Sequence, residues 1–432
     1  RTRRLRYLAA ASVAGMAVTS GLAIAAVDAR DEARDQRNEA QHQRAQADGL
    51  IEFMLTDLRG KLEPVGRLDV LDSVGQRALS YYAGQDLATL DPDALGRRAR
   101  ALHLVAEVGD LRGNSDAARQ GFREAARSTG ELLKRDPGNW QRVYDHAQSE
   151  FWLAYDAHNR DDPKTALRHF MAYRELAQRL MQLAPRKSES QLELASAEIN
   201  LGTALVRDRR LEPAIASFDR AATGLRAMPR TRDVALNLNQ ALGHKASALY
   251  ALGDNQAALD NRRQQLAVLD SPPLDSKDRE VQEAKAIVLA QSGIAYLASG
   301  SRAASENLLD QAISQWNELI ALANTLWSGE RNAGWMWRAV VRAAGASSRA
   351  RQELEAVTAS QRRLVARSPD WVHKINLLRM ISFERAMGAA PDPADERLIR
   401  EVWARRDTLK SDERAVLAAV LISEGDRAAL ED

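Results

Sequence analysis

One recurring motif constrains the fold of this 432-residue chain more than any other feature. Each copy has a glycine-like turn residue, a small residue five positions later, a bulky residue four further on, and a last residue, usually small, after three more. The first small residue, here called the anchor, falls at Ala118, Ala166, Ala214, Ala258, Ser305 and Ala350. Successive anchors are 48, 48, 44, 47 and 45 residues apart. A period of this size indicates a repeat array.

The residue types within the motif suit two antiparallel helices joined by a tight turn. A small anchor lets the two helices approach, and the bulky residue one turn later fills the space between them. The bulky position is held by Phe122, Phe170, Phe218, Leu309 and Leu354, and by Arg262 in the fourth copy, where the apolar side chain is lost. Proline follows three of the anchors by 19 residues, at Pro137, Pro185 and Pro369, and ends the second helix. Because one pair cannot bury its own apolar face, neighbouring pairs must stack.

The composition agrees with an all-α fold and restricts the possible partners. Ala, Leu, Arg, Glu and Gln dominate, which are strong helix formers, and runs typical of strands are almost absent. Lys plus Arg total 61 and Asp plus Glu total 59, so the net charge of +2 gives no field for nucleic acid. The chain has no cysteine, which excludes disulfides, thiolate metal sites and cysteine nucleophiles.

No catalytic motif is recognisable. The chain has no GxxxxGK[ST] loop, no GxGxxG after a strand, no HExxH and no GxSxG. None of the seven histidines pairs with another at the spacing of a helical metal site. We therefore expect no catalytic activity of its own, no cofactor and no metal.

Near the N-terminus, residues 7–27 carry no charge over 21 positions, long enough to span a bilayer core of roughly 20 residues. Four arginines among residues 1–6 precede this segment. The positive-inside rule then places residues 1–6 in the cytoplasm and everything after the segment in the periplasm of a Gram-negative cell. The alternative is a cleaved signal peptide, with Ala23-Ile24-Ala25 as its cleavage site.

Residues 28–62 have the pattern of one long stalk helix, which Pro64 and Gly66 would end. Small and polar residues recur along it at alternating spacings of four and three, a weak heptad seam. The stalk is either a solvated single helix or the contact of a homodimer. Its last turns carry apolar residues, among them Ile51 and Phe53, that must bury against something folded.

The motif resembles the tetratricopeptide repeat, with its small residue, aromatic residue, alanine and final proline. The resemblance covers roughly residues 95–370 and departs from the family in its period, which is near 46 and not 34. It implies a right-handed solenoid of antiparallel helix pairs over residues 63–370. Residues 371–432 would form a helical cap, with helices at 371–387, 394–409 and 412–421. Trp316, Trp327, Trp335 and Trp337 are expected in the core of degenerate units, or else in an exposed contact patch.

In a tetratricopeptide-like array the first helix of each pair lines the concave face. Carried over from the anchors, this geometry implies a groove for a protein or peptide partner, unless the same side chains pack between helices. The candidate groove residues are His103, Glu107, Phe151, Tyr155, His158, Asn200, Thr203, Arg207, His244, Ser247 and Tyr250.

The stretches at residues 49–82 and 101–113 resemble a group of proteobacterial multidomain signalling proteins. In these a kinase, TIR-like or winged-helix head precedes a single membrane span and a tetratricopeptide-like array. Because the sequence begins at Arg1 rather than at methionine, we expect it to be a fragment. The expected function is a membrane-tethered interaction or sensor module. Two alternatives stay open: a secreted or periplasmic assembly scaffold with a cleaved signal, or the regulatory half of an enzyme whose catalytic domain lies upstream.

Overall fold

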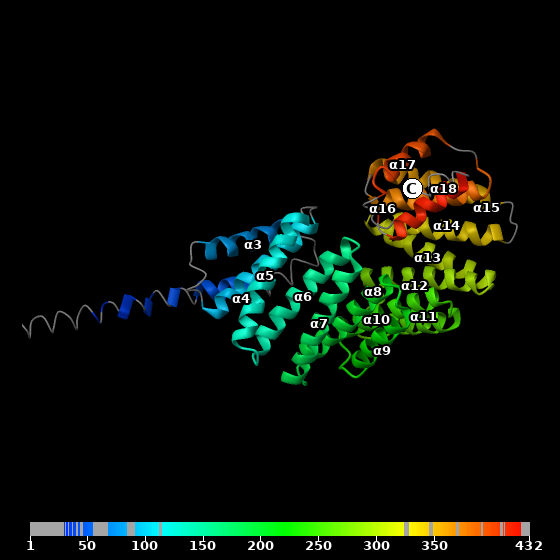
Figure 1. Cartoon of the computed structure of the whole chain (residues 1–432). Coiled ribbons are helices and arrows are strands. Elements are labelled where there is room, and N and C mark those ends of the chain that lie inside the picture. The colour runs from blue at the N-terminus through cyan, green and yellow to red at the C-terminus, as the bar shows by residue number, and fades with distance from the viewer. Residues whose placement is uncertain are drawn as a thin grey trace, which may run out of the picture. The chain divides into compact units, whose positions relative to one another are not determined.

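The computed structural model describes residues 30, 32, 34–36, 38–39, 42–43, 46–54, 68–83, 91–111, 115–323, 328–344, 349–368, 371–389, 392–406, 409 and 411–424. Within these residues every regular element is a helix, which confirms the all-α fold (Figure 1). The span predicted at residues 7–27 lies outside them, and no helix among them is long and apolar enough to cross a membrane.

The chain divides into two compact units, residues 1–136 and 137–432. The first unit contains α3 (Leu68–Ala83), α4 (Pro92–Leu111) and α5 (Ser115–Arg135), and α4 packs against both of the others. The described part of the stalk is helical through residue 53. Its Ile51 is buried in one cluster with Leu104 of α4, and its Asp48 forms an ion pair with Arg97 at 2.7 Å. Residues 46–54 of the stalk are thus packed against α4 within the first unit.

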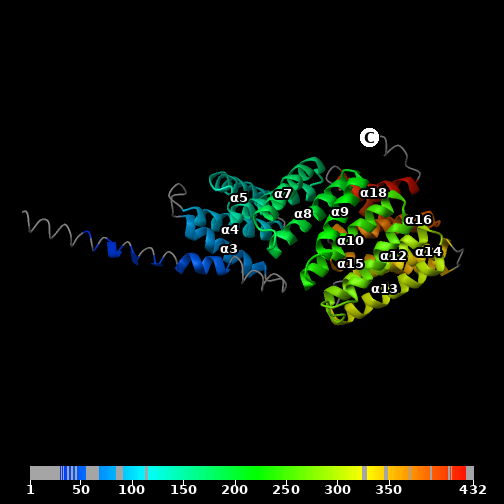
Figure 2. The same cartoon turned by 90° about the horizontal axis from the view of Figure 1, so that it is seen from below.

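The second unit is a succession of helices in which each packs against the next from α6 to α16 (Figures 1 and 2). Their bounds are α6 Trp140–Asn159, α7 Pro163–Leu183, α8 Ser188–Arg207, α9 Leu211–Arg226, α10 Arg232–Leu252, α11 Asn255–Leu269, α12 Arg279–Ala298, α13 Arg302–Ala323, α14 Ser328–Ala344, α15 Arg349–Arg367, α16 Trp371–Ala386, α17 Pro393–Trp403 and α18 Ser411–Glu424. The division between the units falls inside the range 63–370 that the sequence assigns to one array. The handedness of the solenoid stays a prediction.

The anchors confirm the register of the repeat. Five of them are the fourth residue of a second helix, in α5, α7, α9, α11 and α13, and the sixth is the second residue of α15. All six are exposed by 3% or less. The bulky position is buried in every copy, including the fourth, where it is Arg262. The helix pairs therefore meet through the side chains that the motif selects.

The turn residues explain the glycine-like position of the motif. Asp161, Arg209, Gly253 and Gly300 all have a left-handed backbone, with φ of 57°, 58°, 91° and 79°. Glycine adopts this conformation without strain, whereas a residue with a Cβ adopts it at a cost. In two of these turns an aspartate then caps the next helix: Asp162 accepts from the Thr165 amide and Asp254 from the Ala257 amide.

Several smaller expectations can be compared with the structure. Helices α5 and α7 end two residues before Pro137 and Pro185, as predicted. Trp316 is buried, and Trp335 and Trp337 pack partly buried against apolar clusters, which confirms the core interpretation for these three. Trp327 lies outside the described residues.

The C-terminal helices differ from the predicted bounds at their ends. Helix α17 ends at Trp403, before the predicted residue 409, and α18 extends to Glu424 instead of ending at residue 421. Helix α18 also reaches back to the second repeat, because Arg414 donates to Asp161, 253 residues earlier, at 3.1 Å.

Candidate functional site

The groove residues predicted in the first repeat lie in the first compact unit. His103 is 5% exposed, with its ring 6.5 Å from that of Phe122. Glu107, one turn later on α4, is half-buried. The other predicted groove residues belong to the second unit.

On α6 the structure brings Phe151 and Tyr155 together. Their rings stack with centroids 6.1 Å apart, and Phe151 also contacts Phe170 and Tyr173 of α7 at 6.3 and 5.7 Å. Phe151 therefore packs against the core between the two helices, while Tyr155 lies at the edge of this core. His158, the third candidate of this helix, is half-buried.

The three candidates on α8 all interact within the chain. Asn200 and Thr203 donate to carbonyl oxygens one turn earlier on the same helix, at 2.9 and 3.0 Å. Arg207 forms an ion pair with Asp161 at 3.0 Å, which ties the end of α8 to the turn after α6.

On α10 the predicted residues take two different positions. The ring of His244 stacks on that of Phe218 at 5.6 Å, and burial lowers the pKa of the imidazole. Ser247 and Tyr250 instead line one small cavity together with Arg262. Whether the predicted residues bind a partner stays a prediction.

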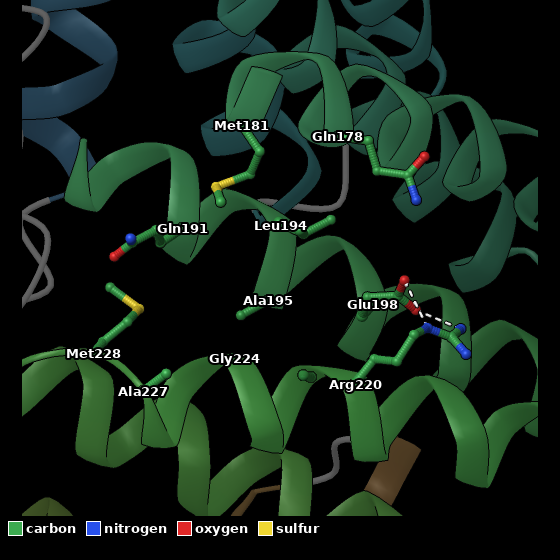
Figure 3. Close-up of a pocket in the computed structure, with 11 residues that line it drawn as sticks. Gln178, Met181, Gln191, Leu194, Ala195, Glu198, Arg220, Gly224, Ala227 and Met228 are labelled. Carbon is green, nitrogen blue, oxygen red and sulfur yellow. Dashed lines mark hydrogen bonds and ion pairs between the residues drawn. The ribbon is translucent and has the colours of Figure 1, made fainter. Parts of the chain in front are cut away.

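A larger cavity of about 320 Å³ opens in the second unit between α7, α8 and α9 (Figure 3). Its apolar part includes Met181, Leu194, Ala195 and Met228, and the two methionines approach the same space from opposite sides. Unbranched methionine side chains adapt to apolar groups of different shapes. Gly224 on α9 leaves space there, because an added Cβ would meet no atom within 4 Å.

Polar groups surround this apolar cavity. Gln178 and Gln191 present amides at its margin. At one end Glu198, which is 4% exposed, accepts two hydrogen bonds from Arg220, from Nε at 3.0 Å and from Nη2 at 2.8 Å. This hydrogen-bonded pair raises the pKa of Arg220 and fixes both side chains. An apolar cavity with a few fixed polar groups is the usual composition of a binding pocket.

Sequence reasoning missed this cavity, because it placed the binding face on first helices alone. Here the cavity is lined by one first helix, α8, and by the two second helices on either side of it, α7 and α9. The sequence signal that could have located it is a set of small residues on α8 and near the end of α9: Ala195, Ala221, Gly224 and Ala227. No group of histidine, aspartate and glutamate side chains within the described residues could hold a metal ion.

The buried anchors, the left-handed turns and the stacked pairs define a tetratricopeptide-like helical repeat protein. No family model and no curated protein matches the chain. Among solved structures, the apo form of RapI is similar with a TM-score of 0.56 and 12% identity, over 88% of this chain and 94% of that one. BtubC from P. vanneervenii is similar with a TM-score of 0.44 and 17% identity, over 59% of this chain and 92% of that one. The Rap conjugation regulator of plasmid pLS20, in complex with a Phr peptide, is similar with a TM-score of 0.43 and 14% identity. The match covers 76% of this chain and 79% of that one.

Proposed function

We propose that this chain is a protein-interaction scaffold, and that a protein or peptide partner binds in the cavity between α7, α8 and α9. The single observation that carries the proposal is the composition of that cavity. Met181, Leu194 and Met228 offer an apolar surface large enough for one bulky side chain, and Gln178 and Gln191 offer amides that can bond a peptide backbone. The three helices are held by the packing of the repeats, so the pocket is preformed.

Gly224→Leu tests this proposal. The leucine extends into the cavity without a clash at its Cβ, and it removes a helical glycine, so the variant should fold at least as well as the parent. We expect a photo-crosslinker at Met228 of the full chain to capture a specific protein in host cells. That capture should be lost in the Gly224→Leu background.

Thr223→Leu is the matched control, since Thr223 is the exposed neighbour of Gly224 on the same helix. Capture should persist in that variant. Equal capture in both leucine variants, or none from the parent chain, would contradict a partner site at this cavity.

We further propose that the scaffold is the membrane-tethered sensor half of a larger bacterial signalling protein. The uncharged residues 7–27 and the resemblance to proteobacterial signalling proteins support this proposal. They also leave the two alternatives, a periplasmic scaffold with a cleaved signal and the regulatory half of an upstream enzyme. Dimerisation through the stalk belongs to the same proposal.

A reporter fused after Asp432 tests the topology. We expect periplasmic alkaline phosphatase activity and a membrane-bound full-length product. Activity of a cytoplasmic reporter at the same position would contradict the orientation, and a released, shortened product would favour the cleaved signal. A kinase, TIR-like or winged-helix domain encoded directly upstream of Arg1 would favour a larger signalling protein or enzyme over a periplasmic scaffold.

A further inference from the structure

The fourth repeat buries a cation where the other copies bury an apolar side chain. The position four residues after the anchor is Phe or Leu in five copies and Arg262 in the fourth. Arg262 is only 6% exposed, so its guanidinium lies inside the packing of α10 and α11. Leaving a charge without a counter-ion in such a place costs free energy.

The partners of Arg262 are all neutral within the described residues. Its Nη1 donates to Oε1 of Gln265 at 2.8 Å, and its Nη2 donates to Oγ of Ser247 at 2.9 Å. Gln265 in turn donates to the backbone oxygen of Asn239 at 2.9 Å. These groups satisfy part of the guanidinium, which has five N–H donors, and they contribute no negative charge.

The guanidinium is nevertheless charged at neutral pH, because burial lowers the pKa of Arg262 only to about 10. The nearby imidazole does not compensate this charge. Burial, and then the charge of Arg262, lower the pKa of His244, so that ring is neutral. The structure therefore holds one unbalanced positive charge between α10 and α11.

This charge borders a cavity of about 150 Å³ between α10, α11 and α12. Hydrogen-bonding side chains of Ser247, Tyr250 and Gln291 line it beside Arg262. Tyr250 is 40% exposed, so the cavity is accessible from solvent. A glycine makes room for the polar cluster, since a Cβ at Gly243 would lie 2.6 Å from Nε2 of Gln265.

We propose that this cavity binds one carboxylate group of the partner, held by the guanidinium of Arg262, the hydroxyl of Tyr250 and the amide of Gln291. A planar guanidinium offers paired N–H groups that match the two oxygens of a carboxylate. One negative charge balances the one cation that the site contains. The inference rests on the proposed scaffold function and gives it a chemistry: the partner carries an acidic side chain or a C-terminus at this point.

Small probes test the site without the natural partner. The first is a capped tripeptide with a central aspartate, the second is acetyl-trialanine with a free C-terminus, and the third is the capped tripeptide with a central asparagine. Each is titrated into the full chain at constant ionic strength, and the arginine Nε–Hε resonances are followed by NMR. The Arg262 resonance is assigned by its loss in Arg262→Lys.

We expect one or both carboxylate probes to shift the Arg262 resonance saturably, and the asparagine probe to leave it in place. The probe that shifts it identifies the source of the carboxylate. Tyr250→Phe removes one hydroxyl at the mouth of the cavity and should weaken the probe affinity several-fold without unfolding the chain. Arg263→Gln is the matched control, because Arg263 is an exposed neighbour on the same helix, and it should leave the affinity unchanged.

Equal responses to all three probes, or no response to any, would overturn the carboxylate site. Either result is separate from the crosslinking experiment, which reports on the cavity between α7, α8 and α9. A partner captured there with no carboxylate response at Arg262 would leave the scaffold function standing and remove this inference alone.

Discussion

The ring of Phe218 lies against the backbone of Gly202, so closely that a Cβ on that glycine would be 2.5 Å from Cε1 of the ring. Phe218 is the bulky residue of the third repeat, and Gly202 lies on the preceding first helix, twelve positions before the anchor. The fifth repeat has the same contact, where a Cβ on Gly293 would be 2.9 Å from Cγ of Leu309. In these two repeats a large side chain therefore packs directly against the bare backbone of the preceding first helix.

Gly202→Ala should therefore destabilise the second unit, although alanine is the better helix former. The added methyl must displace the buried Phe218 ring, and overpacking of this kind costs about 1–3 kcal/mol. Gly224→Ala is the matched control in open space and should gain about 0.5–1 kcal/mol. Urea unfolding measures both, and a stabilised Gly202→Ala variant would contradict the close contact.

Phe170→Ala should lower the free energy of unfolding by about 3–5 kcal/mol, because the ring is 3% exposed and its removal leaves a cavity between α6 and α7. Met171→Ala, at the adjacent and 43% exposed position, should change it far less. The two variants are compared by thermal and urea unfolding. Similar losses of stability in the two variants would mean that Phe170 does not occupy the core position between α6 and α7 that the repeat register assigns to it.

The sequence predicts the repeat because its determinants are local and recur. Each anchor and each bulky residue occupies the same place in a helix pair. The same packing arrangement therefore recurs in six copies, which makes its pattern recognisable in the sequence. The turns were predictable for the same reason, since Gly253 and Gly300 indicate a left-handed backbone. Asp161 and Arg209 adopt it too, which no single copy would have revealed.

The cavities could not be predicted, because they depend on how neighbouring pairs diverge rather than on one pair. Arg262 looked like the loss of a bulky apolar residue. Its burial depends on Gln265 and on acceptors from α10, which a motif does not specify. The exposure of each predicted groove residue likewise depends on how the neighbouring helices pack around it. His103 is buried, whereas Tyr250 is exposed.

Glu193 gives the second unit a pH dependence. Burial raises its pKa to about 7, although hydrogen bonds from Tyr173 and Gln148 oppose the shift. Between pH 4.5 and 7 the folded chain thus keeps a proton that the unfolded chain releases, so stability falls as pH rises through this window and levels off above it. The loss is on the order of 3 kcal/mol.

Glu193→Gln should remove this component and be more stable than the parent at pH 8, with little difference at pH 4. Urea unfolding at a series of pH values measures it. Glu175→Gln, which removes an exposed carboxylate on α7, serves as the control. An unchanged slope between pH 4.5 and 7 in Glu193→Gln would refute the assignment.

The turn between α8 and α9 contains strain that glycine would relieve. Arg209 has φ of 58° and is exposed, and its backbone amide donates to Val206 O at 3.0 Å. Arg209→Gly should therefore raise the free energy of unfolding by up to about 1 kcal/mol. Arg210→Gly, at a residue with φ of −100°, should give no such gain. Thermal unfolding compares them, and the opposite order would show that the turn is not strained.

Restoring the repeat pattern in the fourth copy should stabilise the fold and remove the carboxylate site together. The double variant Arg262→Phe with Gln265→Ala gives α11 the residues that α5 and α9 have at the same positions. It replaces a desolvated cation and its amide partner by apolar side chains, and replacing buried charged groups by well-packed apolar residues is often neutral or stabilising by about 1–4 kcal/mol. We expect a higher melting temperature and no response to the carboxylate probes, whereas Arg263→Ala should alter neither. If the double variant is less stable than the parent, then the polar cluster at Arg262 contributes to the stability of the core, and the expected stabilisation is wrong.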